Sequence, residues 1–428
     1  MVRLYKTLEY FVVINTFISP RPRQSLEGSE TNMINALRNV VVVGGSYVGV
    51  NAAKELANLL PSTHRVLLIE PHSHFHHLFA FPRFAILPDH EHKAFIPYKG
   101  VFSAAPDASR HAVVKARVVS LQATQLTLDR EWEGSRLVSF EYLVAASGTR
   151  LPAPGSMQSN EKPPSVDYFK VHQEGVKKAP SILIIGGGAV GVQMACDLKE
   201  VYPDKEITLV HSRDVLMPVY HEKLSNIIKD RFKELGVNLV TGSRVIVPPA
   251  GFPTDGRAFE VELKDGQKLS TNLAILATGQ TPNNGFLSSL RSSSKDSLIN
   301  PANGFIRVLP TFQFQDPLYP NMFAIGDIAD SGAHKAAKPG MGQASAAARN
   351  IVAMIEGKAP SETVAVAPPA IHLTLGLTKN IIFRNPNLKE GATEPFTNLK
   401  DDGQADMGIE GVWAKRGVTV ASPQEYHL

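Results

Sequence analysis

Short, uninterrupted runs of apolar residues are spaced along this chain, and each ends at glycines or at a polar residue. Two of them open closely similar segments, VVVVGGSYVGVNAAKELANLL at 40–60 and ILIIGGGAVGVQMACDLKEVY at 182–202, in which glycines separate the apolar run from a helical pattern. Continuous apolar runs of this length are typical of parallel strands buried on both faces by helices. The pattern therefore predicts an α/β fold with doubly wound, Rossmann-like sheets.

The similarity between the two segments extends further along the chain. The run VLLIEP, which ends at Pro71, corresponds to ITLVHS, which ends at Ser212, and YLVAASG at 142–148 corresponds to AILATG at 274–279. This internal repeat indicates two copies of one nucleotide-binding module. We expect one domain at 38–150 and 282–356, with the second module inserted into it at 151–281 after a proline-rich crossing.

The turn of the first module carries the residues expected to hold a dinucleotide, which are Gly44, Gly45, Ser46, Tyr47 and Gly49. Gly44 permits the tight strand-to-helix turn, Gly49 lets the helix pack closely on the strand, and backbone N–H groups at the helix start face a pyrophosphate. Ser46 stands where a second glycine is usual, and we interpret it as a tolerated substitution. Glu70 ends the next strand, where its carboxylate can accept hydrogen bonds from both ribose hydroxyls.

The second module keeps all three glycine positions, at Gly186, Gly188 and Gly191, and its second strand runs into His211, Ser212 and Arg213. No acid stands where the first module has Glu70. Because an acid would repel a 2′-phosphate whereas Ser212 and Arg213 can bind one, we expect NADPH to be accepted at least as well as NADH. Gln193 is either a contact to the nicotinamide ribose or carboxamide, or an ordinary residue of the first helical turn.

Composition narrows the class of protein. Apolar residues make up 43% of the 428 and charged residues 20%, as in soluble globular proteins, and the length is enough for at least two domains of about 150 residues. The net charge of +4 is small for this length, so we expect no nucleic-acid partner. Cys196 is the one cysteine, which excludes a disulfide framework and a Cys-x-x-Cys redox pair.

The first 37 residues are expected to form an extension, disordered or with a targeting role. The stretch 8–18 is mostly apolar but is interrupted by polar residues, and about 20 apolar residues are needed to span a bilayer, so we expect no transmembrane helix. Basic residues in the extension suit a mitochondrial leader, but its glutamates do not. Val2 excludes N-myristoylation at this start. Cytoplasmic and mitochondrial locations both stay open, with or without peripheral membrane attachment.

Three stretches carry a resemblance to a known family: FHHLFAFPR at 75–83, LVHSR at 209–213 and FAIGDIAD at 323–330. With the two modules, they resemble the flavoprotein reductases that have two dinucleotide domains and a glutathione-reductase-like fold. The resemblance is specific to the apoptosis-inducing-factor-like branch, which includes the ferroptosis suppressor type of NAD(P)H:quinone oxidoreductase. It implies FAD in the first module, NAD(P)H in the second, and a Gly-Asp pair that returns the chain to the flavin.

The resemblance also assigns individual residues. It places Asp327, after Gly326, on the ribityl chain, Arg83 against the cofactor, and the Val118 backbone at the adenine. Lys338 and Pro339 begin a helix whose N-terminus is expected near the isoalloxazine, where its positive end stabilises reduced flavin. Ser147, Gly148, Thr278 and Gly279, at the ends of the corresponding strands of the repeat, complete the expected cofactor contacts.

We expect neither a metal site nor a dedicated catalytic residue. Six histidines lie within 72–92, but this stretch coincides with the flavin-flanking segment of the family, so we expect no metal site. The disulfide reductases of this fold use a cysteine pair beside the flavin, and this chain has none. Electrons must therefore leave to a diffusible acceptor, and hydride transfer requires stacking and orientation more than an acid or a base.

The segment 357–428 is expected to form a small α+β domain, with a strand pair at 370–383 and a final strand at 411–420. It packs over the flavin edge or forms a homodimer contact, and Trp413 is a packing anchor or an acceptor contact. The leading function is an FAD-dependent oxidoreductase that passes electrons from NAD(P)H to a quinone-like acceptor. The alternatives are a flavoenzyme that tailors a small metabolite and a cell-death signalling protein that uses FAD structurally.

Overall fold

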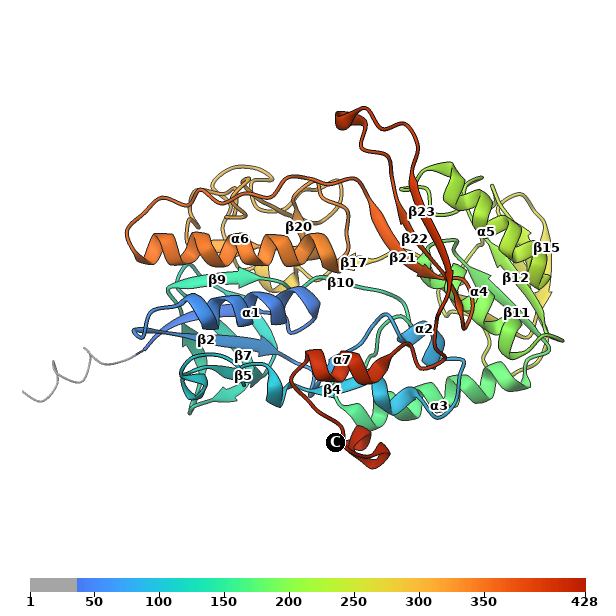
Figure 1. Ribbon diagram of the computed structural model, residues 1–428, viewed down its shortest axis with the longest axis horizontal. Coiled ribbons are helices and arrows are strands. Elements are labelled where there is room, and N and C mark those ends of the chain that lie inside the picture. The colour runs from blue at the N-terminus through green and yellow to red at the C-terminus, as the bar shows by residue number, and fades with distance from the viewer. Residues whose placement is uncertain (1–36) are drawn as a thin grey trace, which may run out of the picture. The chain divides into compact units, whose positions relative to one another are not determined.

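The computed structural model describes residues 37–428 (Figure 1). The expectations of an N-terminal extension, a targeting segment and a disordered start concern residues outside this part of the chain. Within it, no helix is both long enough and apolar enough to cross a membrane.

The first sheet is parallel throughout, in the order β19 (Met322–Ala324), β9 (Tyr142–Ala145), β1 (Arg38–Val43), β2 (His64–Glu70) and β5 (Ala112–Lys115). Alternate residues of β1 face opposite layers. Val40 and Val42 pack under helices α1 (Tyr47–Leu59) and α6 (Ala337–Ile355). Val41 and Val43 pack against the antiparallel sheet of β6 (Val118–Leu121), β7 (Gln125–Trp132) and β8 (Ser135–Ser139). The apolar run at 40–43 is thus buried on both faces.

The second sheet repeats this arrangement, with parallel strands in the order β13 (Asn238–Val240), β12 (Glu206–Val210), β11 (Ser181–Ile185) and β16 (Leu273–Leu276). One face packs on helices α3 (Lys162–Lys178), α4 (Ala189–Val201) and α5 (Glu222–Leu235). The other face packs on the hairpin of β14 (Phe259–Glu262) and β15 (Lys268–Thr271). The two parallel sheets confirm the predicted α/β, Rossmann-like fold.

The two sheets are joined by paired crossing segments. β10 (Thr149–Arg150) leaves the first sheet and β17 (Thr281–Pro282) returns from the second, and the two pair antiparallel. β18 (Ile306–Arg307) and β20 (Ala329–Asp330) form a further short pair, and β3 (His74–His76) pairs with β4 (Phe95–Pro97). After the crossing, β19 joins the first sheet beside β9.

The C-terminal segment contributes to both halves of the molecule. The antiparallel strands β21 (Ala370–Thr374), β22 (Lys379–Arg384) and β23 (Phe396–Asp401) include the predicted strand pair, and Leu373, Ile381 and Phe383 join the core of the second sheet. The predicted final strand at 411–420 is wrong, because a helix, α7 (Ile409–Lys415), occupies this stretch. Ile409 and Trp413, four residues apart, face the core of the first sheet, and Gly417 ends the helical stretch at φ +75°.

Candidate functional site

The first glycine turn has the geometry of a dinucleotide site. Gly44 lies at φ +108°, and a Cβ there would be 2.5 Å from the carbonyl oxygen of Ala146. At Gly49, a Cβ would lie 1.8 Å from the carbonyl oxygen of Gly44. Ser46 is the N-cap of α1 at φ −86°, a conformation that does not require glycine, and its side chain makes no capping hydrogen bond. The backbone N–H groups at this helix start are therefore available to a pyrophosphate.

Glu70 is held at the end of β2 as a buried hydrogen-bond acceptor. Its Oε2 accepts from the Gly45 backbone N–H at 2.5 Å, and its Oε1 accepts from the His72 backbone N–H at 2.9 Å and contacts His72 Nδ1 at 2.5 Å. Burial alone would raise the pKa of Glu70, but the contacts with His72 and Gly45 outweigh it and lower the pKa. Glu70 is therefore a carboxylate at neutral pH, which suits ribose hydroxyls.

Gly326, the residue before Asp327, lies between the starts of α1 and α6. Gly326 donates its N–H to Gln343 Oε1 of α6 at 2.8 Å, and a Cβ at Gly340 of α6 would lie 2.5 Å from Val48 of α1. The turn before Asp327 is thus pinned between α1 and α6. Burial raises the pKa of Asp327, and Lys335 opposes the rise. Lys338 is exposed in the first turn of α6, next to Pro339.

Lys335 is a residue of this site that sequence reasoning missed. Its Nζ donates to the Ala329 carbonyl, lies 4.0 Å from the centre of the Phe305 ring and interacts with Asp327. Burial lowers its pKa, with Asp327 and Asp330 acting in the opposite direction. The available signal was its place in the loop between the Gly-Asp pair and the alanine- and glycine-rich helix, closer to Asp327 than Lys338 is.

The second glycine turn repeats the geometry of the first. Gly186 lies at φ +123° with a would-be Cβ 2.3 Å from the Ala277 carbonyl oxygen, and a Cβ at Gly191 would lie 1.9 Å from that of Gly186. Gly188, the N-cap of α4, has no atom within 4 Å of its would-be Cβ. The space in front of this helix start is therefore open for a ligand.

His211 occupies the position that Glu70 has in the first module. Its Nδ1 accepts the Gly187 backbone N–H at 3.1 Å, as Glu70 accepts that of Gly45. The neutral ring then carries its proton on Nε2, which is buried among protein atoms. Burial lowers the pKa of His211, opposed by the Val215 backbone and assisted by Arg213. The side chain is therefore a neutral acceptor for the second glycine turn, and it lies next to the exposed Ser212 and Arg213.

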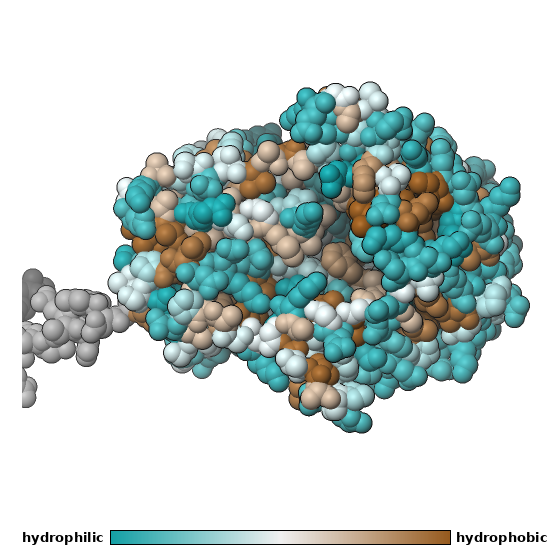
Figure 2. Space-filling model, viewed as in Figure 1, coloured by the Kyte–Doolittle hydropathy of each residue, from teal (hydrophilic) through white to brown (hydrophobic). Residues whose placement is uncertain are grey.

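The residues that follow β9 and β16 have different surroundings. Thr278 and Gly279 line a cavity of about 400 Å³ with Arg150, Leu151, Pro152, Gln280 and Thr281. Ser147 and Gly148 are bound to the returning chain, because Ser147 Oγ donates to the Asn283 carbonyl at 2.8 Å and the Gly148 carbonyl accepts the Asn283 N–H at 3.0 Å. The face drawn in Figure 2 is hollowed near its centre. Val118 begins β6 with its side chain in the core, which leaves only its backbone for an adenine.

Arg83 does not have the position that the resemblance implied. Its side chain is 1% exposed and forms a bidentate ion pair with Asp197 of α4, at 3.0 and 2.9 Å. Its other donors bond the carbonyls of Gly376, Leu377 and Gln404. A guanidinium has five N–H groups, and all five are engaged, so none is left for a cofactor. The expectation that Arg83 contacts the flavin is therefore corrected to a contact between segments.

Neither the histidines nor the cysteine form a reactive cluster. Within residues 37–428, no group of three or more His, Cys, Asp or Glu side chains is placed to hold a metal ion. His77 pairs with the Tyr47 hydroxyl at 2.8 Å, and His76 packs against Phe81 and Phe95. Cys196 is buried in α4, and burial raises the pKa of its thiol, so it stays protonated and unreactive.

Comparisons with known proteins agree with this geometry. Residues 38–350 match the family model described as pyridine nucleotide-disulphide oxidoreductase. The chain is 34% identical to Fe-regulated protein 8 of Mycosarcoma maydis over 405 residues, 90% of this chain and 96% of the relative. It is 28% identical to ferroptosis suppressor protein 1 of Mus musculus over 365 residues, 82% of this chain and 90% of the relative. Apoptosis-inducing factor homolog B of Dictyostelium discoideum is 27% identical over 386 residues, covering 84% and 93%.

A solved structure shares the fold as well. The sulfide:quinone oxidoreductase of Aquifex aeolicus superposes with a TM-score of 0.68 and 19% identity, covering 91% of this chain and 94% of that one. The family binds FAD and NAD(P)H, and the match spans both glycine turns and the Gly-Asp pair, while the cysteine pair of the disulfide reductases is missing. The chain therefore belongs to the pyridine nucleotide-disulphide oxidoreductase family, and it is an FAD-dependent NAD(P)H oxidoreductase similar to the apoptosis-inducing-factor and ferroptosis-suppressor branch.

Proposed function

We propose that this protein passes electrons from NAD(P)H through FAD to a quinone or a similar small, diffusible acceptor. The observation that carries the proposal is the combination of two open glycine turns with a single, fully buried cysteine. Without a disulfide to receive them, electrons that enter from the nicotinamide leave through a separate acceptor. The exposed Phe79 ring, whose centroid lies 4.6 Å from that of the Tyr47 ring, offers an apolar surface next to the first turn.

The residues of this chain have distinct parts in the proposal. FAD, when bound, supplies the hydride-accepting ring. The start of α1 holds its pyrophosphate, Glu70 its adenine ribose, and Asp327 its ribityl chain. Lys335 and the start of α6 stabilise negative charge near the ring. The chain needs no acid or base for the hydride step itself, because orientation is what that step requires.

We propose that NADPH is accepted at least as well as NADH. Ser212 is exposed at the end of β12, and its hydroxyl can donate to a 2′-phosphate. Arg213 adds a positive charge beside it. Replacing Arg213 with Ser is expected to raise the KM for NADPH by roughly tenfold and to leave that for NADH nearly unchanged, since one charge-assisted hydrogen bond contributes about 1.5 kcal/mol or more.

Anaerobic reduction of the purified protein tests the proposal. The visible flavin band is followed after addition of NADH or NADPH, and ubiquinone with a short side chain is then added without oxygen. Rapid bleaching followed by reoxidation within seconds is the expected result. Bleaching without reoxidation would exclude the quinone class and favour another acceptor. A flavin that resists both nicotinamides would overturn the proposed electron path from the second module.

We also propose that the protein forms a homodimer and that it attaches peripherally to membranes. Sedimentation of the same sample, alone and with anionic lipid vesicles, separates them. The sedimentation coefficient of a monomer would contradict the homodimer. A protein that stays in the supernatant when the vesicles are pelleted would contradict membrane attachment.

A further inference from the structure

The buried ion pair between Arg83 and Asp197 joins three segments that are distant in the sequence. Arg83 lies on α2 (Phe81–Phe84), and Asp197 lies on α4 of the second module. The three carbonyls that Arg83 also binds belong to the C-terminal segment, at Gly376 and Leu377 after β21 and at Gln404 after β23. One guanidinium is thus the common contact of the first module, the second module and the C-terminal strands.

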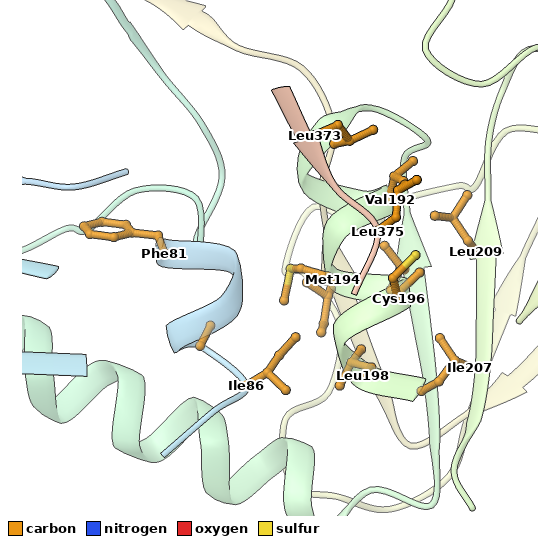
Figure 3. Close-up of a cluster of buried hydrophobic side chains, with 14 of the residues drawn as sticks. Phe81, Ile86, Val192, Met194, Cys196, Leu198, Ile207, Leu209, Leu373 and Leu375 are labelled. Carbon is orange, nitrogen blue, oxygen red and sulfur yellow. The ribbon is translucent and has the colours of Figure 1, made fainter. Parts of the chain in front are cut away.

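The surroundings of this pair are apolar. Phe81 and Ile86 flank Arg83 in the sequence, Cys196 and Leu198 flank Asp197, and all four side chains belong to one buried cluster, which also includes Leu375 (Figure 3). Exposed fractions of 1% for Arg83 and 0% for Asp197 mean that both charges have lost their water. Burial raises the pKa of Asp197, and the charge and hydrogen bonds of Arg83 offset only part of this rise.

Such a pair contributes little to stability in comparison with hydrophobic residues of similar size, because desolvation of two charges offsets their attraction. An apolar contact between α2 and α4 would hold the protein together equally well. An apolar contact, however, tolerates sliding and rotation, whereas a planar guanidinium with five directed donors accepts one arrangement of its acceptors. The pair is therefore better suited to defining geometry than to adding stability.

Helix α4, which the pair holds, also carries Gln193 and begins at the second glycine turn. Gln193 lies one helical turn before Asp197 on α4, it is buried, and its amide is among the groups that lower the Asp197 pKa. The Gln193 amide also faces Met407 Sδ at 3.9 Å, in the same C-terminal loop that supplies Gln404. The start of α4, at Gly188, is the expected site of the NAD(P)H pyrophosphate, and the space beside it is open. A shift of α4 would therefore move Gln193 and this helix start together.

We propose that Arg83 is a positioning residue for hydride transfer: by holding Asp197 and the turn at 376–377, it fixes α4, and with it Gln193 and the nicotinamide, relative to the flavin. This inference rests on the proposed path from the second module to the flavin. It does not depend on which acceptor takes the electrons. Arg83 itself touches neither nucleotide, which agrees with the complete use of its donors by protein atoms.

The test replaces the whole pair with apolar residues and measures the reductive half-reaction. In the double variant Arg83→Met with Asp197→Leu, no buried charge is left unpaired, so folding and FAD content are expected to be kept. The limiting rate of flavin bleaching at saturating NADPH is expected to fall roughly 10- to 100-fold, as for a small misplacement of reacting groups. The Kd for NADPH should change about threefold or less, and the long-wavelength charge-transfer absorbance of the stacked nicotinamide and flavin should weaken.

A surface ion pair provides the matched control. Lys379 of β22 and Glu234 of α5 also join the C-terminal strands to the second module, at 3.2 Å, but both are about half exposed. The double variant Lys379→Met with Glu234→Gln is expected to keep the wild-type rate and charge-transfer band. Arg83→Lys keeps the positive charge but loses the planar, forked guanidinium. Its limiting rate should lie between those of the wild type and the apolar double variant.

Other outcomes decide against the inference. A folded apolar double variant with the wild-type limiting rate and charge-transfer band would show that the pair is only structural. If that variant does not fold, Asp197→Asn keeps the volume of the side chain, and an unchanged limiting rate in it would overturn the inference in the same way. Reoxidation by quinone is not part of these measurements, so failure of the proposed acceptor leaves them interpretable.

Discussion

The helices after the two glycine turns begin at different N-cap residues, Ser46 and Gly188. Ser46 (φ −86°, ψ −163°) and Gly188 (φ −87°, ψ −175°) have nearly the same backbone conformation, which any residue adopts. A serine in one module and a glycine in the other are therefore equally compatible with the turn. The backbone requirement for glycine lies instead at Gly44 and Gly186, which have positive φ, and the need for close packing lies at Gly49 and Gly191.

Because Gly188 and Gly191 have different surroundings, we expect an alanine at Gly188 to affect NADPH binding and an alanine at Gly191 to affect stability. Gly188→Ala adds a methyl group where no protein atom lies within 4 Å, so the melting temperature should stay the same while the Kd for NADPH rises about tenfold, because the methyl group enters the ligand space. Gly191→Ala would place a Cβ 1.9 Å from a carbonyl oxygen and should destabilise the fold by about 1–3 kcal/mol. Thermal unfolding and titration with NADPH measure the two effects. Equal NADPH affinity in Gly188→Ala would contradict the proposed location of the pyrophosphate.

His77 predicts a pH-dependent stability. Burial, with a smaller effect of Arg416, lowers the pKa of His77 from 6.5 to about 4. Between pH 6.5 and 4, the unfolded chain therefore binds a proton at His77 that the folded protein does not. The free energy of unfolding is therefore highest above pH 6.5 and decreases as the pH falls toward 4. The loss amounts to about 3 kcal/mol. Urea unfolding at pH 7.5 and 4.5 should show a smaller decrease for His77→Gln than for the wild type. Equal decreases would place the titration elsewhere.

At the scale of elements, helix α7 shows where a pattern was ambiguous. The stretch 411–420 contains valines and glycines, which led to the expectation of a strand with a turn. The period that matters is the four-residue spacing of Ile409 and Trp413, both buried in the core of the first sheet. Trp413 Nε1 also donates to the Lys93 carbonyl at 2.8 Å. The tryptophan is thus an anchor between the C-terminal segment and the first module.

Substitutions in α7 test this anchor. Trp413→Ala should destabilise the protein by about 3–5 kcal/mol, because it empties a large buried volume. Trp413→Phe should cost less, since most of the packing remains and the hydrogen bond is lost. Gly411→Ala, on the exposed side of the same helix, has no atom near the added methyl group and should stabilise by up to about 1 kcal/mol. Urea unfolding measures all three, and a destabilised Gly411→Ala would contradict the helical assignment.

At the scale of the whole molecule, the C-terminal segment completes two cores. Its strands add Leu373, Ile381 and Phe383 to the core of the second sheet, and α7 adds Trp413 to that of the first. The topology, in which β19 returns to the first sheet, supports the domain limits that we propose: 38–150 with 282–356 for FAD, 151–281 for NAD(P)H, and 357–428 for the C-terminal domain. The C-terminal domain is then a part of both neighbours rather than a separate unit.

This arrangement predicts the effect of removing the segment. A protein ending at residue 365 should lose most of its bound FAD and lower its melting temperature by at least about 10 °C, because both cores lose buried side chains. Shortening only the turn at 388–392, which projects with the exposed Leu388 at the end of the β22–β23 hairpin (Figure 1), should change neither. The FAD-to-protein ratio and thermal unfolding report both results. Full FAD content in the protein ending at 365 would show that the segment is dispensable.

The sequence by itself determined the features that are built from contiguous residues. Each strand, glycine turn, helix and following strand lies within about 30 residues, so spacing alone predicted both sheets and the acid at Glu70. The count of one cysteine excluded a redox pair in the same way. The arrangement of Gly44, Gly49, Gly186 and Gly191 agrees with the sequence-based interpretation, because the contacts that require these glycines are made to their own turns and to the neighbouring strand.

Only the tertiary structure decided the features that depend on distant contacts. Arg83 meets Asp197 114 positions away and Gln404 321 positions away, so no local pattern indicates that its donors are used by the protein. His211 replaces Glu70 as the acceptor for the second glycine turn, although the two residue types differ. The packing of α7 on the core of the first sheet and the position of Lys335 beside Asp327 also depend on how separate segments pack. The physical reason is that local propensity sets an element, whereas the burial and hydrogen bonding of a side chain are set by its neighbours in space.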